Sequence, residues 1–422
     1  MMKVFMRCAA VCAAAAVTLT GCSGKDLFTY ESHRPIAVPE QISYSWWGNE
    51  ARNEYTIEGI KDFEEQNTDI KVNTFSGSYM GYKENLDTLM RSGIEYDVMQ
   101  IDHKWLDEYS ADGEGFYDLY EIGGKLNFNN FDDEVLESGV RNGKLNGIPV
   151  SLDALCFCYN YDIFDQRKIE KPRNWNDLLR CGEKLSKDGI SVLSADEDAI
   201  WIMLCAYAEQ ISGKQAFASE DSDECFGADE VTAMMQYAQK MFDNGSVKKT
   251  SSMPDAFSKG RSAGRMTFIS DISDSIKPLE DAGMHIIMGR NPEAPSAKRW
   301  GWYVRPTGFY AISKNTENID DAAKLLDYLL NDPGMAALQG MEKGLPASKS
   351  ALETLEAKDQ LSGLIYDADK QSKLGGDVHI MDSRMYEEDR YSEFFRLVEL
   401  VRRGDIEASE AAEKFVSEYP FG

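Results

Sequence analysis

The sequence is poor in metal-binding side chains and in positive charge. Its 422 residues contain four scattered histidines and eight cysteines, and no pair of cysteines has the spacing of a zinc site. Lys and Arg number 45 against 72 Asp and Glu, which gives a net charge of −27. Such a chain is repelled by nucleic acid and by anionic lipid headgroups. We therefore expect no metal, no cofactor and no nucleic-acid partner.

Several motifs are also missing. The chain has no glycine-rich phosphate loop of the G-x-x-x-x-G-K type, no internal repeat and no hydrolytic motif. An apolar content of 43% and 20 tyrosines argue against disorder over most of the length. The length suits two domains of ordinary size. We expect a folded protein that is not an enzyme.

Residues 1–21 have the features of an export signal. A positively charged start precedes an apolar stretch, Cys8 to Val17, that is too short to remain as a membrane-spanning helix. Leu19-Thr20-Gly21-Cys22 then resembles the lipobox of bacterial lipoproteins, which implies cleavage before Cys22 and lipidation of its sulfur. The alternative is an ordinary secretory signal. Residues 22–40 would form a lipidated tether that holds the protein at the outer face of the bacterial cytoplasmic membrane, extracellular or periplasmic.

Five cysteines remain in the rest of the chain: Cys156, Cys158, Cys181, Cys205 and Cys225. An odd number cannot be fully paired within one chain, and whether any two form a disulfide stays open. Cys156 and Cys158 would share one face of a strand. We interpret these residues as buried small side chains in preference to a redox or metal site.

Alternating and helical periodicities predict an α/β fold. Strands are expected over 42–46, 70–74 and 98–101, with amphipathic helices over 52–65 and 82–90 between them. This order is typical of a parallel sheet covered by helices. Further strands are expected over 152–159, 266–269 and 308–313, and further helices from 174 and over 200–211, 231–242, 319–330, 386–402 and 409–419.

Aromatic and polar residues gather where these first strands end. Ligands bind outside the carboxyl ends of the strands in such sheets, so we expect these residues to converge on one edge. An aromatic face with carboxylate, amide and guanidinium groups around it suits a sugar, whose apolar face stacks on a ring. We expect one indole of the adjacent Trp46 and Trp47 to be buried and the other exposed. The candidate residues are Trp46, Trp47, Asn49, Arg52, Tyr79, Tyr82, Asp102 and His103.

Several stretches in order resemble the extracellular solute-binding proteins of ABC importers, family 1, carbohydrate type. They include Tyr44–Asn49, Phe63–Val72, Gly143–Pro149, Tyr159–Phe164 and Gly344–Ser348. The resemblance implies a two-lobed periplasmic-binding-protein-like fold with a hinge and an inter-lobe ligand cleft. Lobe one would comprise residues 41–152 plus 306–345, and lobe two residues 153–305 plus 346–422.

The resemblance also implies site residues at the first crossing and in lobe two: Asp153, Trp201, Asp271, Trp300 and Trp302. Trp300 and Trp302 should share one role, either binding or packing, since they alternate around Gly301. Ser270-Asp271 replaces an aromatic residue that the family often has, and Asp102-His103 replaces a common Asn. Both departures favour a more polar or differently shaped ligand.

The implied function is binding of a ligand without catalysis of a reaction. A sugar or oligosaccharide would bind one lobe, the hinge would close, and the protein would deliver its ligand to the permease subunits of an ABC importer. We expect a monomer tethered to the membrane through Cys22. Two alternatives stay open: the same fold binding a peptide, polyamine or other polar solute, and a surface glycosidase, which needs two carboxyl groups about 5–10 Å apart.

Overall fold

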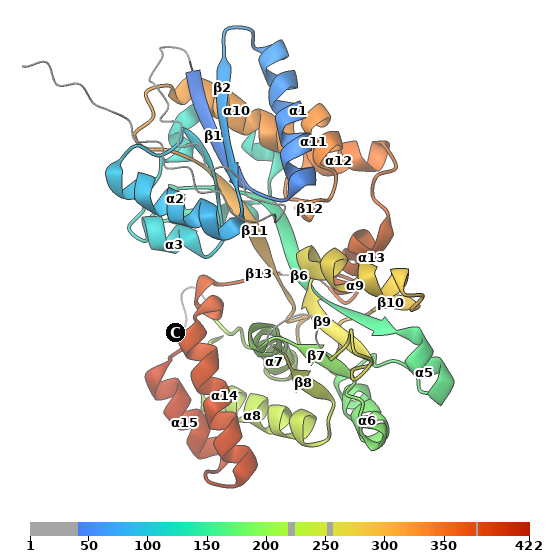
Figure 1. Cartoon of the computed structure of the whole chain (residues 1–422). Helices are drawn as coiled ribbons and strands as arrows, with labels where there is room; N and C mark the ends of the chain where they lie inside the picture. The colour runs from blue at the N-terminus through green and yellow to red at the C-terminus, as the bar shows by residue number, and fades with distance from the viewer. Residues whose placement is uncertain (1–40, 218–223, 251–255, 377–378) are drawn as a thin grey trace, which may run out of the picture. The chain divides into compact units, whose positions relative to one another are not determined.

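Most strands belong to one mixed β-sheet, and two long strands of this sheet extend from one hydrophobic core into the other (Figure 1). The computed structural model describes residues 41–217, 224–250, 256–376 and 379–422. The predicted export signal, the tether and Cys22 lie outside the described residues. The strand order is β2-β1-β3-β11-β6-β9-β7-β8, with β10 and β12 paired to β6 and β13 paired to β11.

The strands of this sheet are β1 (Gln41–Trp47), β2 (Lys71–Gly77), β3 (Val98–Ile101), β6 (Ile148–Asn160), β7 (Leu193–Ala195), β8 (Val247–Lys249), β9 (Gly264–Phe268), β10 (Ile286–Gly289), β11 (Tyr303–Ile312), β12 (Leu345–Pro346) and β13 (His379–Ile380). A separate antiparallel pair comprises β4 (Val140–Arg141) and β5 (Lys144–Leu145).

The helices are α1 (Glu50–Gln66), α2 (Tyr79–Ser92), α3 (Trp105–Ser110), α4 (Asp133–Glu137), α5 (Tyr161–Arg167), α6 (Trp175–Leu185), α7 (Glu197–Ser212), α8 (Ala228–Asp243), α9 (Ile272–Asp281), α10 (Ile319–Asn331), α11 (Pro333–Gln339), α12 (Lys349–Ala357), α13 (Gly363–Ser372), α14 (Glu388–Arg403) and α15 (Ala408–Glu418). Two short 3-10 turns matter below, η5 (Ile269–Asp271) and η6 (Ser383–Tyr386).

The predicted parallel arrangement is confirmed for the first three strands. β1 pairs in parallel with both β2 and β3. β11 then joins β3 antiparallel and also pairs antiparallel with β6. The central part of the sheet is therefore mixed, because β6 and β11 run in opposite directions between the two cores.

Capping side chains fix the starts of several helices. The Asn174 side chain accepts a hydrogen bond from the backbone of Asp177 at 2.9 Å and begins α6 where a capped start is predicted. Asp332-Pro333-Gly334 follows the predicted helix over 319–330 and begins α11. Asp332 accepts from Gly334 N at 2.7 Å and Met335 N at 3.0 Å. Pro333 suits the first helical position, where its missing N–H leaves no bond unmade.

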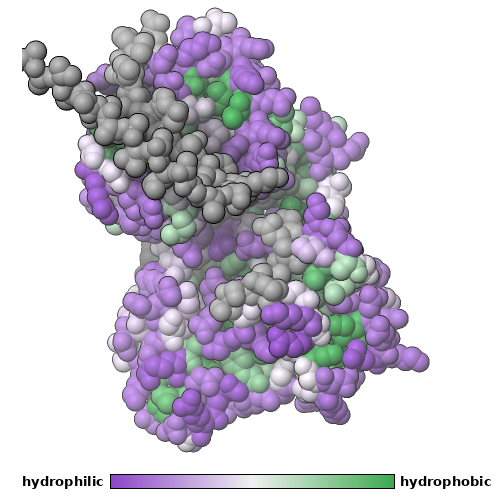
Figure 2. Space-filling model, viewed as in Figure 1, coloured by the Kyte–Doolittle hydropathy of each residue, from purple (hydrophilic) through white to green (hydrophobic). Residues whose placement is uncertain are grey.

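Two sets of buried side chains form the two lobes of the α/β fold. One set draws on residues 42–150 and 309–347 and includes Tyr44, Phe63 and Tyr310. The other draws on residues 154–304 and 364–421 and includes Phe157 and Phe394. On the face shown in Figure 2, hydrophilic residues dominate and hydrophobic ones form small separate groups, as expected when apolar side chains fill the cores.

All five cysteines of the described part are buried, as the sequence predicts. The Cys156 thiol donates to Thr267 O and the Cys158 thiol to Arg265 O, each at 3.3 Å. Burial raises the pKa of Cys156 and Cys205 well above that of an ordinary thiol. No group of three or more His, Cys, Asp or Glu side chains in the described ranges could hold a metal ion.

No helix in the described ranges is long and apolar enough to cross a bilayer.

Trp302 gives a test of the second core. Its ring stacks on Trp175 at 5.8 Å and meets Phe157 edge-on at 5.6 Å, and its Nε1 donates to Pro292 O at 3.1 Å. Trp302→Ala should lower the free energy of unfolding by about 3–5 kcal/mol, because it opens a large cavity. Urea denaturation measures this loss. Leu374→Ala, at a position 53% exposed, should change it by less than about 0.5 kcal/mol. Equal effects of both variants would contradict a packing role for Trp302.

Candidate functional site

A buried ion pair lies on the two strands that connect the cores. Asp153 on β6 is opposite Arg305 on β11 in the strand register, and Arg305 Nη2 is 3.2 Å from Asp153 Oδ2. Asp153 is only 1% exposed and also accepts from Ser270 N at 3.0 Å and Ser270 Oγ at 2.8 Å. These bonds compensate its buried charge, which would otherwise be strongly destabilising.

The guanidinium of Arg305 is held between an aromatic ring and several acids. Its Cζ lies 3.2 Å from the centroid of the Phe268 ring, within the range of a cation–π contact. Burial opposes the charge, but Asp153, Tyr386 and Asp271 together raise the pKa of Arg305. Arg305 therefore stays positively charged in a largely dry position.

Lobe one contributes residues at the ends of β1 and β3 and at the start of α2. Trp47 packs against Tyr79, Tyr82 and Trp105 with ring centroids 5.2–5.7 Å apart. Of these four rings only Tyr79 is substantially exposed, at 41%. Asp102 is buried beside Tyr79, and burial raises the pKa of its carboxyl. Tyr79 is thus the accessible flat surface of a buried aromatic cluster.

His103 lies between this cluster and the second lobe. Its ring packs on Tyr386 at 4.7 Å, and its side chain is 9% exposed. Nδ1 is 3.4 Å from Asp102 Oδ1, but neither ring nitrogen has a partner with hydrogen-bond geometry in the described part of the chain. Burial and the nearby Arg305 keep the pKa of His103 well below its usual value, so the ring is neutral.

His103 and Tyr386 also line a cavity of about 450 Å³ that both lobes enclose. Lobe one supplies Glu134 and Arg141 to its wall, and lobe two supplies Phe217, His379, Ile380 and Asp382. Ile380 N donates to Glu134 Oε1 at 2.9 Å, which is a direct hydrogen bond between the lobes. The volume is within the range of small-molecule sites.

Lobe two contributes acids where β7 and β9 end. Asp271 follows β9 in η5 and is exposed, yet surrounding protein and the neighbouring Asp153 raise its pKa. Asp198, in the first turn of α7, interacts with both Asp271 and Arg305. Tyr391 on α14 is half-buried, and burial together with Glu388 and Asp198 raises its pKa to about 12. Aromatic and acidic groups therefore meet Arg305 from both lobes.

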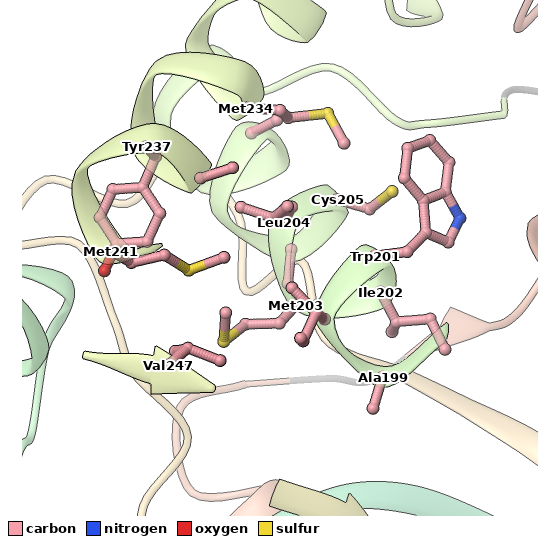
Figure 3. Close-up of a cluster of buried hydrophobic side chains, with 14 of the residues drawn as sticks. Ala199, Trp201, Ile202, Met203, Leu204, Cys205, Met234, Tyr237, Met241 and Val247 are labelled. Carbon is pink, nitrogen blue, oxygen red and sulfur yellow. The ribbon is translucent and has the colours of Figure 1, made fainter. Parts of the chain in front are cut away.

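The structure places all five predicted tryptophans in the cores. The expectation that one of Trp46 and Trp47 is exposed is wrong, since they are 1% and 8% exposed. Trp46 donates Nε1–H to Asn53 Oδ1 at 2.9 Å and stacks on Tyr44. Trp201 is fully buried against Phe394, Phe415 and Phe421. Figure 3 shows Trp201 among other buried side chains of α7, near Cys205.

Trp300 and Trp302 have the same role, as predicted, and that role is packing. Trp300 donates Nε1–H to Ser372 O at 3.2 Å and is 7% exposed. Trp302 packs against Trp175 and Phe157, as described above. Neither indole presents a face to solvent in this structure.

Three other predicted site residues, near the ends of the first strands of the sheet, make structural hydrogen bonds. Asn49 caps α1 by accepting from Arg52 N at 2.9 Å, and Arg52 Nη2 donates to Glu342 O at 3.1 Å. Tyr82 is fully buried and its hydroxyl donates to Gln100 O at 2.9 Å. The predicted residues that the structure groups around Arg305 are Tyr79, Asp102, His103, Asp153 and Asp271.

Sequence reasoning missed Arg305, Phe268, Tyr386, Asp198 and Tyr391. A signal for Arg305 exists, because a charged residue within the apolar run Trp302–Ile312 needs a buried partner. Asp153 interrupts the apolar run 152–159 in the same way. The other four residues come from separate elements, and nothing in the sequence indicates that they meet.

Comparison with known proteins places the chain among binding proteins. The family model described as "Bacterial extracellular solute-binding protein" matches residues 47–336. A maltooligosaccharide ABC transporter solute-binding lipoprotein of Streptococcus pneumoniae is 21% identical over 364 residues, which cover 82% of this chain and 81% of the relative.

Two solved structures have the same fold. A periplasmic oligogalacturonide-binding protein of Yersinia enterocolitica, in complex with saturated digalacturonic acid, has a TM-score of 0.73 at 24% identity, covering 90% of this chain and 97% of that chain. A de novo designed esterase improved by directed evolution has a TM-score of 0.81 at the same identity and coverage.

The ion pair on the crossing strands gives a stability test. Arg305→Met leaves Asp153 buried and unpaired and should lower the free energy of unfolding by about 3–5 kcal/mol in urea denaturation at neutral pH. The double variant Asp153→Asn/Arg305→Met should recover much of this loss, since no lone charge remains. Arg396→Met breaks an exposed pair with Glu393 and should change stability little. An equally small loss of unfolding free energy in Arg305→Met and Arg396→Met would contradict a stabilising role for the Asp153–Arg305 pair.

Proposed function

Since the chain belongs to the bacterial extracellular solute-binding protein family, we propose that it binds a sugar or oligosaccharide between its lobes and delivers it to an ABC importer permease. The Asp153–Arg305 pair carries this proposal. It puts planar polar groups on the two strands that join the lobes, with acids and aromatic rings around it. The maltooligosaccharide of the pneumococcal relative and the digalacturonic acid bound in the Yersinia structure support a saccharide.

The proposed contacts divide between stacking and hydrogen bonding. Tyr79 offers the exposed ring on which the apolar face of a sugar can stack. Asp102 and Asp271 offer carboxylate oxygens that accept from sugar hydroxyls, and His103 offers buried ring nitrogens that no described residue meets with hydrogen-bond geometry. Tyrosine therefore replaces tryptophan as the stacking residue, because the indoles are in the cores.

Closure of the lobes would follow ligand binding to one of them. In this proposal the lobes divide near Leu152 on β6 and Arg305 on β11, as the sequence predicts. Because α12 packs on α11 and β12, lobe one extends past residue 345 to Ala357. The ligand shifts the equilibrium only by the difference in its affinity for the open and closed forms. Contacts that form only on closure, such as those to Asp198, Asp271 and Tyr391, would supply that difference.

In the proposed role the protein binds its ligand and catalyses no reaction. The designed esterase with the same fold has 24% identity, so its likeness concerns the fold alone. A glycosidase would need two carboxyl groups about 5–10 Å apart on either side of a glycosidic bond, one as acid and one as base or nucleophile. Asp153 is already ion-paired and bonded twice by Ser270, which does not suit that role.

Tyr79→Ala tests the proposed function. Isothermal titration with short maltooligosaccharides should show saturable binding to the purified protein, and the variant should bind about tenfold more weakly, since it loses about 1.4 kcal/mol of stacking and burial. Tyr120→Ala is the matched control, because Tyr120 is a 48% exposed tyrosine outside the site.

Product analysis by chromatography accompanies the titration. Cleavage of the sugar would refute a binding protein without catalysis. Saturable binding of a peptide or polyamine with no response to any saccharide would favour the same fold with a different solute.

We also propose that the protein is a monomer anchored through Cys22. The family places the chain outside the cytoplasm, and the pneumococcal relative is described as a lipoprotein. A diacylated cysteine supplies two chains, enough for stable attachment, whereas one chain gives only marginal binding. The anchor would keep the binding protein close to its permease.

Cys22→Ser should move the protein from the membrane fraction to the soluble extracytoplasmic fraction and abolish labelling by radioactive palmitate. Fractionation and immunoblotting measure the first effect, and autoradiography measures the second. Ser23→Ala is the matched control and should stay in the membrane fraction. Membrane retention and labelling of the Cys22→Ser variant would exclude this residue as the anchor.

A further inference from the structure

The charges around the candidate site are unevenly balanced. Three cations, Arg305, Arg265 and Lys104, interact with a larger set of carboxylates. That set has five members: Asp102, Asp153, Asp196, Asp198 and Asp271. The site is therefore negative before any ligand enters, in a chain that is acidic overall.

The arginines near the site are already bound to carboxylates of the protein. Arg305 pairs with Asp153, and Arg265 Nη2 is 3.2 Å from Asp196 Oδ2. In the wall of the cavity, Arg141 holds Asp107 through Nε and Nη2 and donates Nη1–H to two backbone carbonyls. A sugar acid is recognised best by a bidentate arginine. Arg141 would have to give up its contacts with Asp107 to bind one in this way, and the charge of Arg305, whose Nε has no partner among the described residues, is already balanced by Asp153.

The acids, in contrast, have oxygens available. Asp271 is exposed and has no ion pair within 4.0 Å among the described residues. Desolvation by the surrounding protein raises the pKa of Asp102 and, together with the nearby Asp153, that of Asp271, although Arg305 opposes the shift of both. Both groups accept hydrogen bonds and repel a ligand carboxylate.

We propose that the ligand of this site carries no acidic group, so that the protein takes neutral or amino-bearing saccharides and rejects uronates. This inference rests on the proposed function and sets the chain apart from the oligogalacturonide-binding protein that shares its fold. It follows from two features of the described residues: the arginines already have their charge balanced by carboxylates of the protein, and Asp271 has no ion pair.

A matched pair of ligands tests the inference. Trigalacturonic acid and its fully methyl-esterified form differ in charge while sharing the same sugar backbone. Titration of the full mature chain should show at least tenfold weaker binding of the acid than of the ester. Maltotriose and spermidine serve as a neutral sugar and a cation that is not a sugar. Acid binding as tight as or tighter than ester binding would overturn the inference and leave saccharide binding intact.

The remaining outcomes are also distinct. Binding of spermidine with no response to any sugar would overturn the proposed function while supporting a site that excludes acids. No binding by any of the four probes would overturn both proposals.

A charge reversal gives the complementary test. Asp271→Arg supplies an unpaired guanidinium and should shift the ratio of acid to ester affinity at least tenfold toward the acid. Asp271→Asn removes the charge with little change of size and should shift the ratio in the same direction by less. Circular dichroism and thermal melts establish that both variants fold. An unchanged ratio in both folded variants would contradict control of ligand charge by Asp271.

Discussion

The ion pair between Asp153 and Arg305 is the constraint on which the arrangement of the site depends. A buried carboxylate is tolerated only with compensating partners, and here the partner comes from the neighbouring antiparallel strand. The pair therefore fixes the register of β6 against β11 where the chain passes between cores. Ser270 extends the same network to the end of β9. The carboxylate of Asp153 therefore connects the two crossing strands, β6 and β11, with the segment that follows β9 in the second lobe.

The pairing of β6 with β11 is irregular next to this ion pair. The β6–β11 register shifts between Pro306 and Gly308, immediately after Arg305. Proline has no N–H to donate to the ladder, so regular pairing is broken there. Thr307 occupies the irregular position, and its hydroxyl lies 2.6 Å from Ser151 Oγ. Such bulges change the direction of a strand and are common near functional sites.

Much of the fold could be predicted from the sequence, and less of the site. Local signals, such as the alternation in β1 and the start of α6 after Asn174, specify elements correctly because they depend on neighbouring residues. The expected exposed indole failed for a different reason. A tryptophan at a strand end looks the same in sequence whether its ring turns toward a core or toward solvent, and tertiary packing decides. For Trp46 the deciding contacts are Tyr44 and Asn53, from β1 itself and from α1. Arg305 was detectable as a charge within an apolar run, whereas Tyr386 and Tyr391 were not.

The buried thiols have a consequence for the maturation of an exported protein. A thiol reacts through its thiolate, and burial that raises the pKa of Cys156 and Cys205 suppresses that form. Once the chain has folded outside the cytoplasm, these two buried thiols resist air oxidation and thiol exchange. Speed of folding, more than the action of a disulfide-forming enzyme, would then protect the newly secreted polypeptide from wrong cross-links.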